Sequence, residues 1–374
     1  NDAGVRLLGT PFESIDRAED REKFAKMLKK LKLKQPRNGM ARSLKDAEKI
    51  AEKIGYPILV RPSYVLGGRA MMVAESAKQL AEYFKEAIKV SPEHPVLIDQ
   101  FLQGAVEIDM DLLGDGTNYE LGGILEHVER AGIHSGDSAC MIPPQNLTSN
   151  MLCRLEEQGK ALAKELSVKG LMNIQFAVKD NEIFLIEVNP RASRTVPFVS
   201  KAIGHPLAKY ATWLMLGLNL SEIGFSYEAP QTVSVKETVF PFVSFSGADT
   251  ELGPEMKSTG EVMGRGKNLE EAFIKAQIAA YQSEIKEGSV FIGVTDQDKQ
   301  EMIPAALKFQ QAGRKILATA GTFKVLQKAG VTNLEKTSLD RKEAGNIFEY
   351  LERNEVALIV NTTRSRKRSI DSTH

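Results

Sequence analysis

The sequence predicts an α/β protein with more than one domain. One observation is length, because 374 residues exceed what a single compact hydrophobic core usually organises. A second is a pair of apolar, β-branched runs at 170–178 and 184–189, which flank the polar turn 179–182 as in an antiparallel hairpin. A third is the alternation of strand-like and helix-like segments after residue 288, which is typical of a parallel α/β domain.

The individual elements follow from apolar periodicity and from capping residues. We expect helices at 14–31, 43–54, 75–90, 150–166, 206–217 and 269–286, and strands at 56–61, 96–102, 107–113 and 122–129, besides the hairpin. After a change in composition at Gly247, strands at 289–294, 315–318 and 356–360 alternate with helices at 299–312, 322–329 and 341–352, and one further short strand completes the series.

Composition narrows the classes of function. Lysine and arginine together number 49, as do aspartate and glutamate, so no net field favours nucleic acid as a partner. No apolar run reaches the length of about 18 residues that a membrane span needs. Cys140 and Cys153 lack the close spacing of a zinc site or a disulfide framework, and residues 1–9 lack the features of a signal peptide. We therefore expect a cytoplasmic protein, and the abrupt chain ends predict a piece of something longer.

The hairpin brings chemically useful side chains together. Folded about its turn, it sets Gln175 opposite Glu187, with Asn189 two residues on and on the same face. Two amide oxygens and one carboxylate suit Mg²⁺, which takes a few oxygen ligands from the protein and others from substrate phosphates. Arg191 follows the strand and would hold a phosphoryl group. The alternative is an ordinary hairpin whose polar residues face water.

A glycine-containing loop at 63–73 lies between two strand-like runs. Gly67 and Gly68 would let backbone N–H groups approach phosphate oxygens, and Arg61 and Arg69 add positive charge at its ends. The spacing fits neither a Walker A loop nor a dinucleotide fingerprint. The alternative is a hairpin turn without a ligand.

Two further segments are candidates for nucleotide contact. Residues 107–113 alternate acidic with apolar side chains; Glu107 could accept hydrogen bonds from ribose hydroxyls, or the acids could simply face water. The polar loop 130–138 could pass over a bound nucleotide. We interpret His134 in this loop as a binding or loop-ordering residue, because phosphoryl transfer to a carboxylate-type oxygen requires no proton removal.

The carboxyl ends of the later strands form another candidate site. Thr319 and Thr322 lie between a strand and a helix, where backbone and hydroxyl donors bind anions. Asn361 ends the last expected strand at the same edge, and Lys299 could join it. A phosphorylated small molecule would fit these groups, and ordinary helix caps are the alternative.

Three motifs carry a family resemblance. They read RPSYVLGGR at 61–69, AGIHSGDS at 131–138 and EVNPR at 187–191. Together they resemble the ATP-grasp family and, more narrowly, the large subunits of carbamoyl-phosphate synthetases, over essentially the whole chain. The chain is similar to the second of the two synthetase halves, followed by a methylglyoxal-synthase-like regulatory domain. The resemblance implies phosphorylation of carbamate by ATP with Mg²⁺ or Mn²⁺, giving carbamoyl phosphate and ADP for pyrimidine and arginine precursors.

The resemblance also implies sets of site residues. Nucleotide contacts fall on Arg21, Arg61, Gly67, Gly68, Gln100, Leu102, Glu107, Gly132, Ile133, His134, Ser135, Gln175 and Glu187. Metal ligands fall on Gln175, Glu187 and Asn189, and the arginines that hold the transferred phosphoryl group and the carbamate are Arg191 and Arg194. Contacts to an ornithine-type effector fall on Glu129, Asp137 and Glu237, and contacts to a nucleotide effector on Lys299, Thr319, Thr322, Lys336, Asn361 and Thr363.

The implied organisation has four parts. Residues 1–20 lead into an ATP-grasp synthetase domain at 21–245, residues 246–281 connect, and 282–374 form a regulatory domain that lacks its last strand and helix. The implied partners are a glutamine amidotransferase small subunit, the first synthetase half and small-molecule effectors, within an oligomer. Two alternatives remain: a fragment that binds nucleotides or effectors without activity of its own, and another ATP-grasp ligase such as a biotin carboxylase.

Overall fold

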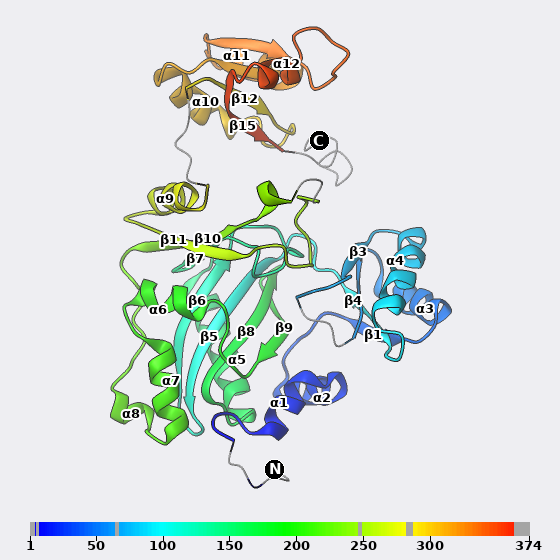
Figure 1. The fold of residues 1–374 in the computed structure, drawn as a ribbon, viewed down its shortest axis with the longest axis vertical. Helices are drawn as coiled ribbons and strands as arrows, with labels where there is room; N and C mark the ends of the chain where they lie inside the picture. Colours follow the sequence, from blue (N-terminus) through cyan, green and yellow to red (C-terminus); the bar gives the residue numbers. More distant parts are fainter. Residues whose placement is uncertain (1–3, 5–6, 64–66, 246–248, 282–286, 363–374) are drawn as a thin grey trace. The chain divides into compact units, whose positions relative to one another are not determined.

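The computed structural model describes residues 4, 7–63, 67–245, 249–281 and 287–362 (Figure 1). The chain divides into two compact units, residues 1–282 and 283–374, and each is described here by itself. Residues 64–66 of the glycine loop, residues 282–286 at the end of an expected helix, and Thr363 lie outside the described residues.

A seven-stranded antiparallel sheet organises the first unit. Its strand order is β11-β10-β7-β6-β5-β8-β9. The strands are β5 Val106–Asp115, β6 Tyr119–His127, β7 Cys140–Ile142, β8 Lys169–Lys179, β9 Glu182–Asn189, β10 Val233–Val239 and β11 Gly260–Gly266. The long strands β5 and β8 are neighbours in the middle of the sheet, so most residues on them are buried.

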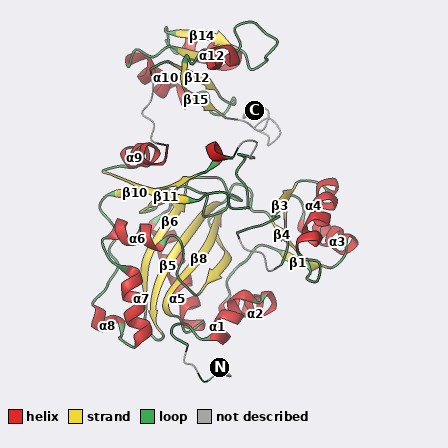
Figure 2. Ribbon diagram, viewed as in Figure 1, coloured by secondary structure: helices red, strands yellow, loops and turns green. Residues whose placement is uncertain are grey.

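The two faces of this sheet have different roles. Strand periodicity directs Met110 and Leu112 of β5 to one face and Asp109, Asp111 and Leu113 to the other. The first face packs apolar residues against α2 and α5. On the second face α6 and α7 cover one end of the strands, around Leu113 (Figure 2). Asp109 and Asp111 share this face, and a small apolar cluster around Ala177 lies farther along β8. The helices are α2 Arg21–Leu31, α5 Ser149–Glu165, α6 Val196–Ile203 and α7 Leu207–Leu216.

A smaller lobe belongs to the same unit. Its antiparallel sheet has the order β1-β4-β2-β3 and packs against α3 and α4 around its own apolar core. The elements are β1 Asn38–Ala41, β2 Ile58–Arg61, β3 Met72–Ala74, β4 Val96–Gln100, α3 Leu44–Ile54 and α4 Ala77–Val90. Ser43 and Ser76 cap the two helices by accepting hydrogen bonds from backbone N–H groups.

Several sequence expectations need correction in the first unit. The helix expected at 14–31 is two helices, α1 Phe12–Glu19 and α2, because Asp20 has extended backbone and its carboxylate caps α2. Strands β1, β7 and β11 were not expected, since each is short or glycine-rich and pairs only with distant segments. The unit also contains α8 Leu220–Ile223, the 3₁₀ turn Phe242–Ser244 and α9 Leu269–Tyr281.

The second unit confirms the prediction of a parallel α/β fold. Its sheet has the order β14-β13-β12-β15 with every pairing parallel. The elements are β12 Ser289–Gly293, α10 Met302–Gln311, β13 Ile316–Thr319, α11 Ala320–Lys328, β14 Leu334–Thr337, α12 Ile347–Glu352 and β15 Val356–Asn361. The helix expected at 341–352 begins only at Ile347, because Asn346 caps it and the residues before form turns.

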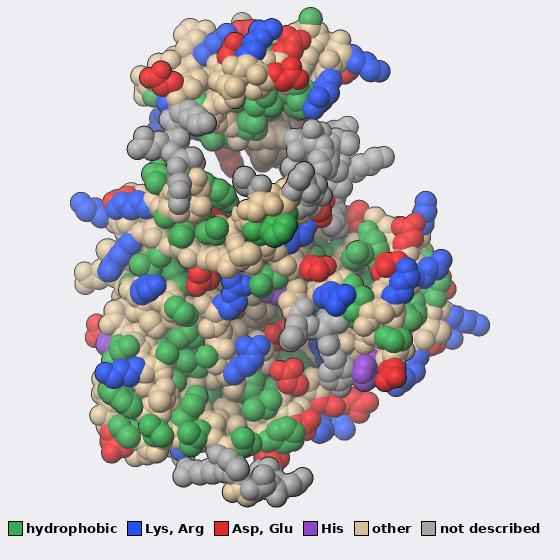
Figure 3. Space-filling view, in the orientation of Figure 1, with side chains coloured by type: hydrophobic (Ala, Val, Ile, Leu, Met, Phe, Trp, Pro, Cys, Tyr) green, Lys and Arg blue, Asp and Glu red, His purple; other side chains and the backbone are tan. Residues whose placement is uncertain are grey.

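The surface agrees with a balanced charge. On the face drawn in Figure 3, acidic and basic side chains are interspersed over the large sheet's unit and the smaller lobe. Among the described residues, no helix combines the length and the hydropathy that crossing a membrane requires. Cys140 is buried, Cys153 is exposed, and both are free thiols.

Candidate functional site

A cavity of about 1340 Å³ lies in the first unit. Its walls come from the lobe, the loop 132–136, the polar face of the large sheet and the segment that follows β9. Pockets for one small molecule usually measure about 300–1,000 Å³, so this cavity has room for a nucleotide and a second substrate.

Most of the residues predicted for nucleotide, metal and phosphoryl contacts line this one cavity. They are Arg21, Arg61, Gly67, Gly68, Glu107, Gly132, Ile133, His134, Ser135, Gln175, Glu187, Asn189, Arg191 and Arg194. Gln100 and Leu102 are not part of its lining. Leu102 is buried in a small apolar cluster, and Gln100 accepts a hydrogen bond from Arg37 Nε at 3.2 Å.

The hairpin forms as predicted. Gln175 and Glu187 are register partners, and Asn189 lies across from Asn173. Asn189 Nδ2 donates to Glu187 Oε1 at 2.6 Å, and Gln175 Nε2 donates to Ser135 Oγ at 2.8 Å. These bonds engage the amide nitrogens and leave Gln175 Oε1 and the Glu187 carboxylate as acceptors at the cavity wall. Asn189 Oδ1 accepts one hydrogen bond from Arg191 and keeps one lone pair.

Two arginines follow the hairpin on an exposed loop. Arg191 Nη2 donates to Asn189 Oδ1 at 3.1 Å, which places its guanidinium beside the oxygen ligands of the hairpin. Arg194 Nη1 donates to Met256 Sδ at 2.7 Å. Both side chains line the cavity, so two fixed positive charges face the same space.

The glycine loop has a structural role in addition to its place at the cavity. Gly67 and Gly68 both have positive φ, at 62° and 69°. A Cβ on Gly68 would lie 2.0 Å from Pro254 O, and Met256 N donates to Gly67 O at 2.9 Å. The glycines therefore let another backbone segment approach closely, whereas the sequence suggested approach of a ligand alone.

Arg61 is held by a carboxylate of the same lobe. Its Nη2 lies 3.2 Å from Asp99 Oδ2, and both side chains are largely buried. Burial raises the pKa of Asp99, and the Arg61 charge and hydrogen bond oppose the rise. The buried Nε atom of Arg61 has no hydrogen-bond partner among the described residues.

Glu107 lies at the start of β5 beside the loop that follows β6. Gly132 N donates to Glu107 Oε1 at 3.0 Å, and His127 Nδ1 lies 3.6 Å from Glu107 Oε2. Burial raises the pKa of Glu107, although the His127 charge and the Gly132 hydrogen bond oppose this. One carboxylate oxygen is thus fixed to the loop.

The loop 132–138 is held in place by several polar contacts. Gly136 N donates to His134 Nδ1 at 3.0 Å, which supports a loop-ordering role for His134. Lys236 is only 1 % exposed, and its Nζ donates to Ser138 O at 2.7 Å. Asp137 is fully buried and accepts hydrogen bonds from Lys257 N and Ser258 N at 2.7 and 2.8 Å.

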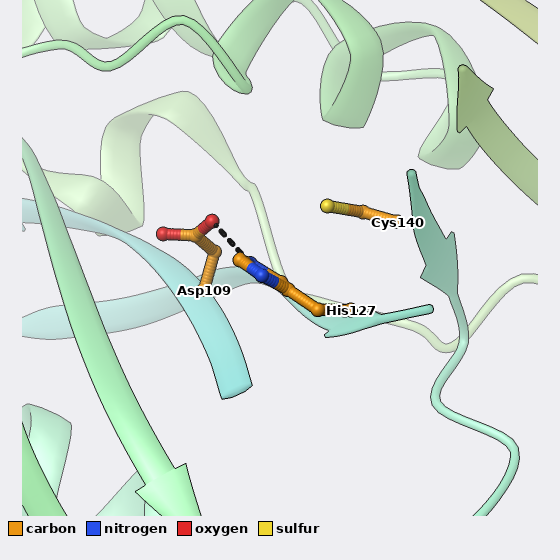
Figure 4. A group of neighbouring side chains, drawn as sticks. All are labelled: Asp109, His127 and Cys140. Atoms are coloured by element: carbon orange, nitrogen blue, oxygen red, sulfur yellow. Dashed lines mark hydrogen bonds and ion pairs between the residues drawn. The ribbon is translucent and has the colours of Figure 1, made fainter. Parts of the chain in front are cut away.

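Three buried side chains, Asp109, His127 and Cys140, form a group at the cavity wall, which Asp109 and His127 help to line (Figure 4). The potential ligand atoms of Asp109, His127 and Cys140 all lie within 4.8 Å of one another. However, His127 Nε2 is already hydrogen-bonded to Asp109 Oδ2 at 2.8 Å, and the Lys236 charge acts on the same carboxylate. Local cations therefore already neutralise Asp109, which indicates an ion pair that supports the sheet and not an open metal site.

The pKa values of this pair move apart, as in an ion pair. Burial opposes ionisation of Asp109, but the hydrogen bond and charge of His127, with the charge of Lys236, hold its pKa below the ordinary value. Burial also disfavours the imidazolium of His127, yet neighbouring Cys140 and Asp109 hold its pKa well above the ordinary value.

Sequence reasoning missed this buried layer. The acids of residues 107–113 could have faced water, but Asp109 is 1 % exposed and Asp111 is 0 % exposed. Lys236, which also lines the cavity, stands between Val235 and Glu237 of β10 and belongs to no motif. The alternation of acidic and apolar residues was the available signal. It shows which residues share a face of the strand, but it does not show which segments cover that face.

The residues predicted for an ornithine-type effector lie outside the cavity lining. Glu129 has a buried oxygen without a partner among the described residues, and burial raises its pKa to about 6. Burial likewise raises the pKa of Glu237, which accepts from Gln277 Nε2 at 2.6 Å. Asp137 already has both carboxylate oxygens engaged by backbone N–H groups.

In the second unit, the predicted effector residues gather near the carboxyl edge of the sheet. Thr319 ends β13, and Asn361 ends β15. Lys299 Nζ would lie 2.6 Å from a Cβ at Gly321, in the first turn of α11, and it also pairs with Asp296. Thr322 is buried and its hydroxyl accepts from Val294 N at 3.4 Å. Lys336 is exposed on the neighbouring strand β14.

The first unit resembles solved structures in fold. One is the biotin carboxylase domain of 2-oxoglutarate carboxylase from Hydrogenobacter thermophilus in complex with MgADP, ADP and bicarbonate, with a TM-score of 0.62 and 17 % identity over 75 % of this chain and 69 % of that one. Another is biotin carboxylase from Campylobacter jejuni, with a TM-score of 0.60 and 16 % identity over 74 % of this chain and 69 % of that one. These identities establish the fold alone.

Sequence comparison is more specific. Residues 20–223 match the ATP-binding domain of the carbamoyl-phosphate synthase L chain, and residues 301–374 match an MGS-like domain. The carbamoyl phosphate synthase large chain of Methanothermobacter thermautotrophicus is 50 % identical over 99 % of this chain, and that of Pasteurella multocida is 48 % identical over 99 %. The C-terminal section of this large chain from Methanocaldococcus jannaschii is 47 % identical over 99 % of this chain and 62 % of its own length.

The chain spans about a third of the full-length relatives, at 35 % of each. The family match over residues 20–223 covers most of the cavity lining; Ala18 and Glu19 precede it, and Lys236 and the lining residues at 254–261 follow it. The chain therefore belongs to the carbamoyl-phosphate synthase large-chain family, in which it carries the ATP-binding domain and an MGS-like domain.

Proposed function

We propose that this chain phosphorylates carbamate with ATP and Mg²⁺ or Mn²⁺, giving carbamoyl phosphate and ADP, as the second synthetase half of a large chain. The observation that carries the proposal is the convergence of Gln175, Glu187, Asn189 and Arg191 on one cavity large enough for a nucleotide. The 50 % identity to a carbamoyl phosphate synthase large chain supports the choice of carbamate as substrate.

The reaction needs positioning and positive charge more than proton transfer. A carbamate oxygen attacks the γ-phosphorus, the bond from phosphorus to the bridging oxygen breaks, and ADP leaves with that electron pair. Arg191 and Arg194 neutralise the charge on the transferred group. His134 is not required as a base, which agrees with its acceptor role toward Gly136 N.

The hairpin fits a divalent cation. Gln175 and Asn189 present amide oxygens, and Glu187 presents a carboxylate at the cavity wall. Such a donor set suits Mg²⁺. When bound, the cation would neutralise phosphate charge, and these three residues would hold it.

Regulation and partners are part of the same proposal. The first unit would receive an ornithine-type effector at Glu129 and Glu237, with Asp137 acting through the backbone it holds. The second unit would take a nucleotide effector near Lys299 and Thr319. The glutamine amidotransferase small subunit and the first synthetase half would supply the substrate, within an oligomer.

The test is ATP formation from carbamoyl phosphate and MgADP by this chain. Glu187→Ala should abolish ATP formation, whereas Glu182→Ala on the same strand, exposed and paired with Lys34, should not change it. Free biotin added in parallel should have no effect; biotin dependence would instead indicate a carboxylase. ATP formation that survives Glu187→Ala would refute the site assignment.

Binding of MgATP distinguishes an active enzyme from a fragment that binds nucleotides without activity of its own. MgATP should raise the melting temperature if the nucleotide site is formed. Stabilisation without ATP formation would mean a nucleotide-binding unit that is inactive alone. The absence of both stabilisation and ATP formation would refute the proposed site.

A further inference from the structure

The loop between β9 and α6 carries Arg191 and Arg194, and one buried carboxylate fastens it to the sheet. Ser193 Oγ donates to Asp111 Oδ1 at 2.9 Å, and Thr195 Oγ1 donates to Asp111 Oδ2 at 2.6 Å. The two hydroxyls lie 2.6 Å apart, one on each side of Arg194 in sequence. Their convergence fixes the backbone from which the arginine side chains project.

Asp111 is well placed to act as an anchor. It lies in the middle of β5 with 0 % exposure, and Asn173 Nδ2 of the neighbouring strand β8 donates to its Oδ1 at 3.0 Å. Burial raises the pKa of Asp111 to about 6, although hydrogen bonds from Thr195, Asn173 and Ser193 oppose the rise. At neutral pH the carboxylate is therefore ionised and can accept all of these hydrogen bonds.

The hydroxyl of Thr195 is engaged with the sheet and not with the start of α6. Thr195 is the N-cap residue of α6, where a threonine hydroxyl normally accepts from a backbone N–H group. Its side chain makes no such bond. The hydroxyl instead donates to a residue 84 positions away in sequence.

We propose that Asp111 is a positioning residue, which sets the place of the loop that carries Arg191 and Arg194 relative to the hairpin that carries Gln175 and Glu187. The link is short, because Asp111 on β5 binds the loop directly and binds Asn173 on β8, two residues before Gln175. What the arginines hold rests on the proposed function; the anchoring of the loop does not.

The first readout is amide hydrogen exchange of residues 191–195 in the whole chain, in Asp111→Asn and Thr195→Val. Each variant removes acceptor or donor capacity at the anchor, so we expect exchange in this loop to become about tenfold faster. Thr195→Ser keeps the hydroxyl and should restore the slow exchange. Unchanged exchange in both Asp111→Asn and Thr195→Val would overturn the proposal.

Asp115→Asn is the matched control. Asp115 lies on the same strand and also accepts several hydrogen bonds, from Thr117 N and Asn118 N at 2.8 and 2.7 Å, but it does not line the cavity. Exchange at 191–195 should stay at the wild-type rate in this variant. Equal acceleration in Asp115→Asn would mean general loosening, and it too would overturn the proposal.

The second readout is kinetic. In Asp111→Asn, kcat for ATP formation should fall about 100-fold while KM for MgADP stays within about twofold, because displaced arginines affect the transferred group and not nucleotide binding. A fall confined to KM would contradict the proposal. If the wild-type chain forms no ATP, the proposed function fails, and the exchange experiment alone then supports or overturns the anchoring.

Discussion

The two units differ in whether their charged side chains are buried or exposed to solvent. In the first unit, Asp109 and Asp111 are buried in the sheet. His127 and Lys236 supply compensating positive charge to Asp109, and Thr195, Asn173 and Ser193 donate hydrogen bonds to Asp111. In the second unit, exposed pairs such as Lys315 with Glu335 lie on the surface, with 45 % and 42 % of the two side chains exposed. Buried charges must be paired and hydrogen-bonded, whereas exposed ones are solvated in any case.

This difference indicates which interactions hold each candidate site in place. The first site rests on a network in which every member depends on its neighbours, so one missing partner leaves a charge uncompensated. The second site uses backbone and hydroxyl groups at strand ends, whose positions follow from the parallel sheet itself. Four substitutions test this contrast between the two units.

The largest effect is expected for the buried ion pair. His127→Ala leaves Asp109 buried without its partner, and should lower the free energy of unfolding by about 3–5 kcal/mol. Urea unfolding followed by fluorescence of Trp213, the single tryptophan, reports on the first unit. Adding Asp109→Asn to His127→Ala should recover part of the loss. A cost below about 1 kcal/mol would show that the pair is not energetically coupled.

The pH dependence of Asp111 comes next. Its folded pKa of about 6 lies above the unfolded value, so protonation favours the folded state and this contribution is lost as pH rises from about 4 to about 6. Relative to wild type, Asp111→Asn should therefore gain about 2 kcal/mol of unfolding free energy between pH 4 and pH 7. A difference that stays constant over this range would contradict the assignment.

A smaller effect is expected at the strand ends of the second unit. Lys299→Ala removes a cation beside the first turn of α11, and should weaken binding of inorganic phosphate about tenfold, or about 1.4 kcal/mol. Titration calorimetry on the whole chain measures this affinity. Lys308→Ala, on the exposed side of α10, is the control and should leave it unchanged. Equal affinities in wild type and Lys299→Ala would remove Lys299 from the site.

The smallest effect is expected for an exposed ion pair. Lys315 and Glu335 are about half exposed, so Lys315→Ala should cost less than about 1 kcal/mol. Hydrogen exchange of the β13 amides measures the stability of this sheet. A loss comparable to that of His127→Ala would erase the contrast between the two units.

Local patterns were sufficient for much of the fold and part of the site. The turn at 179–182 with its flanking apolar runs predicted the hairpin. The pairing of Gln175 with Glu187 also depends on a register shift between Gln175 and Phe176, which the turn position does not predict. The alternation of strands and helices after residue 288 predicted a parallel sheet. These signals work because turn chemistry and side-chain periodicity act over a few residues.

Other features depend on segments far apart in the chain. Strands β1, β7 and β11 have no strand pattern in their own sequences, and they form because each pairs with another strand of its sheet. Gly68 has its role because Pro254 approaches it, and nothing near Gly68 in sequence indicates this contact. We predicted one continuous helix through Asp20. The extended backbone that lets its carboxylate cap α2 cannot be recognised in the sequence.

By itself, the sequence determined the α/β class, the order of the motifs and the chemical kinds of side chain available for binding. Tertiary structure alone decided that the acids of β5 are buried, that His127 and Lys236 compensate Asp109, and that Asp111 holds a loop more than 80 residues away, through Ser193 at a separation of 82. The physical reason is that the cost of burying a charge depends on what surrounds it, and those surroundings come together only when distant strands pair.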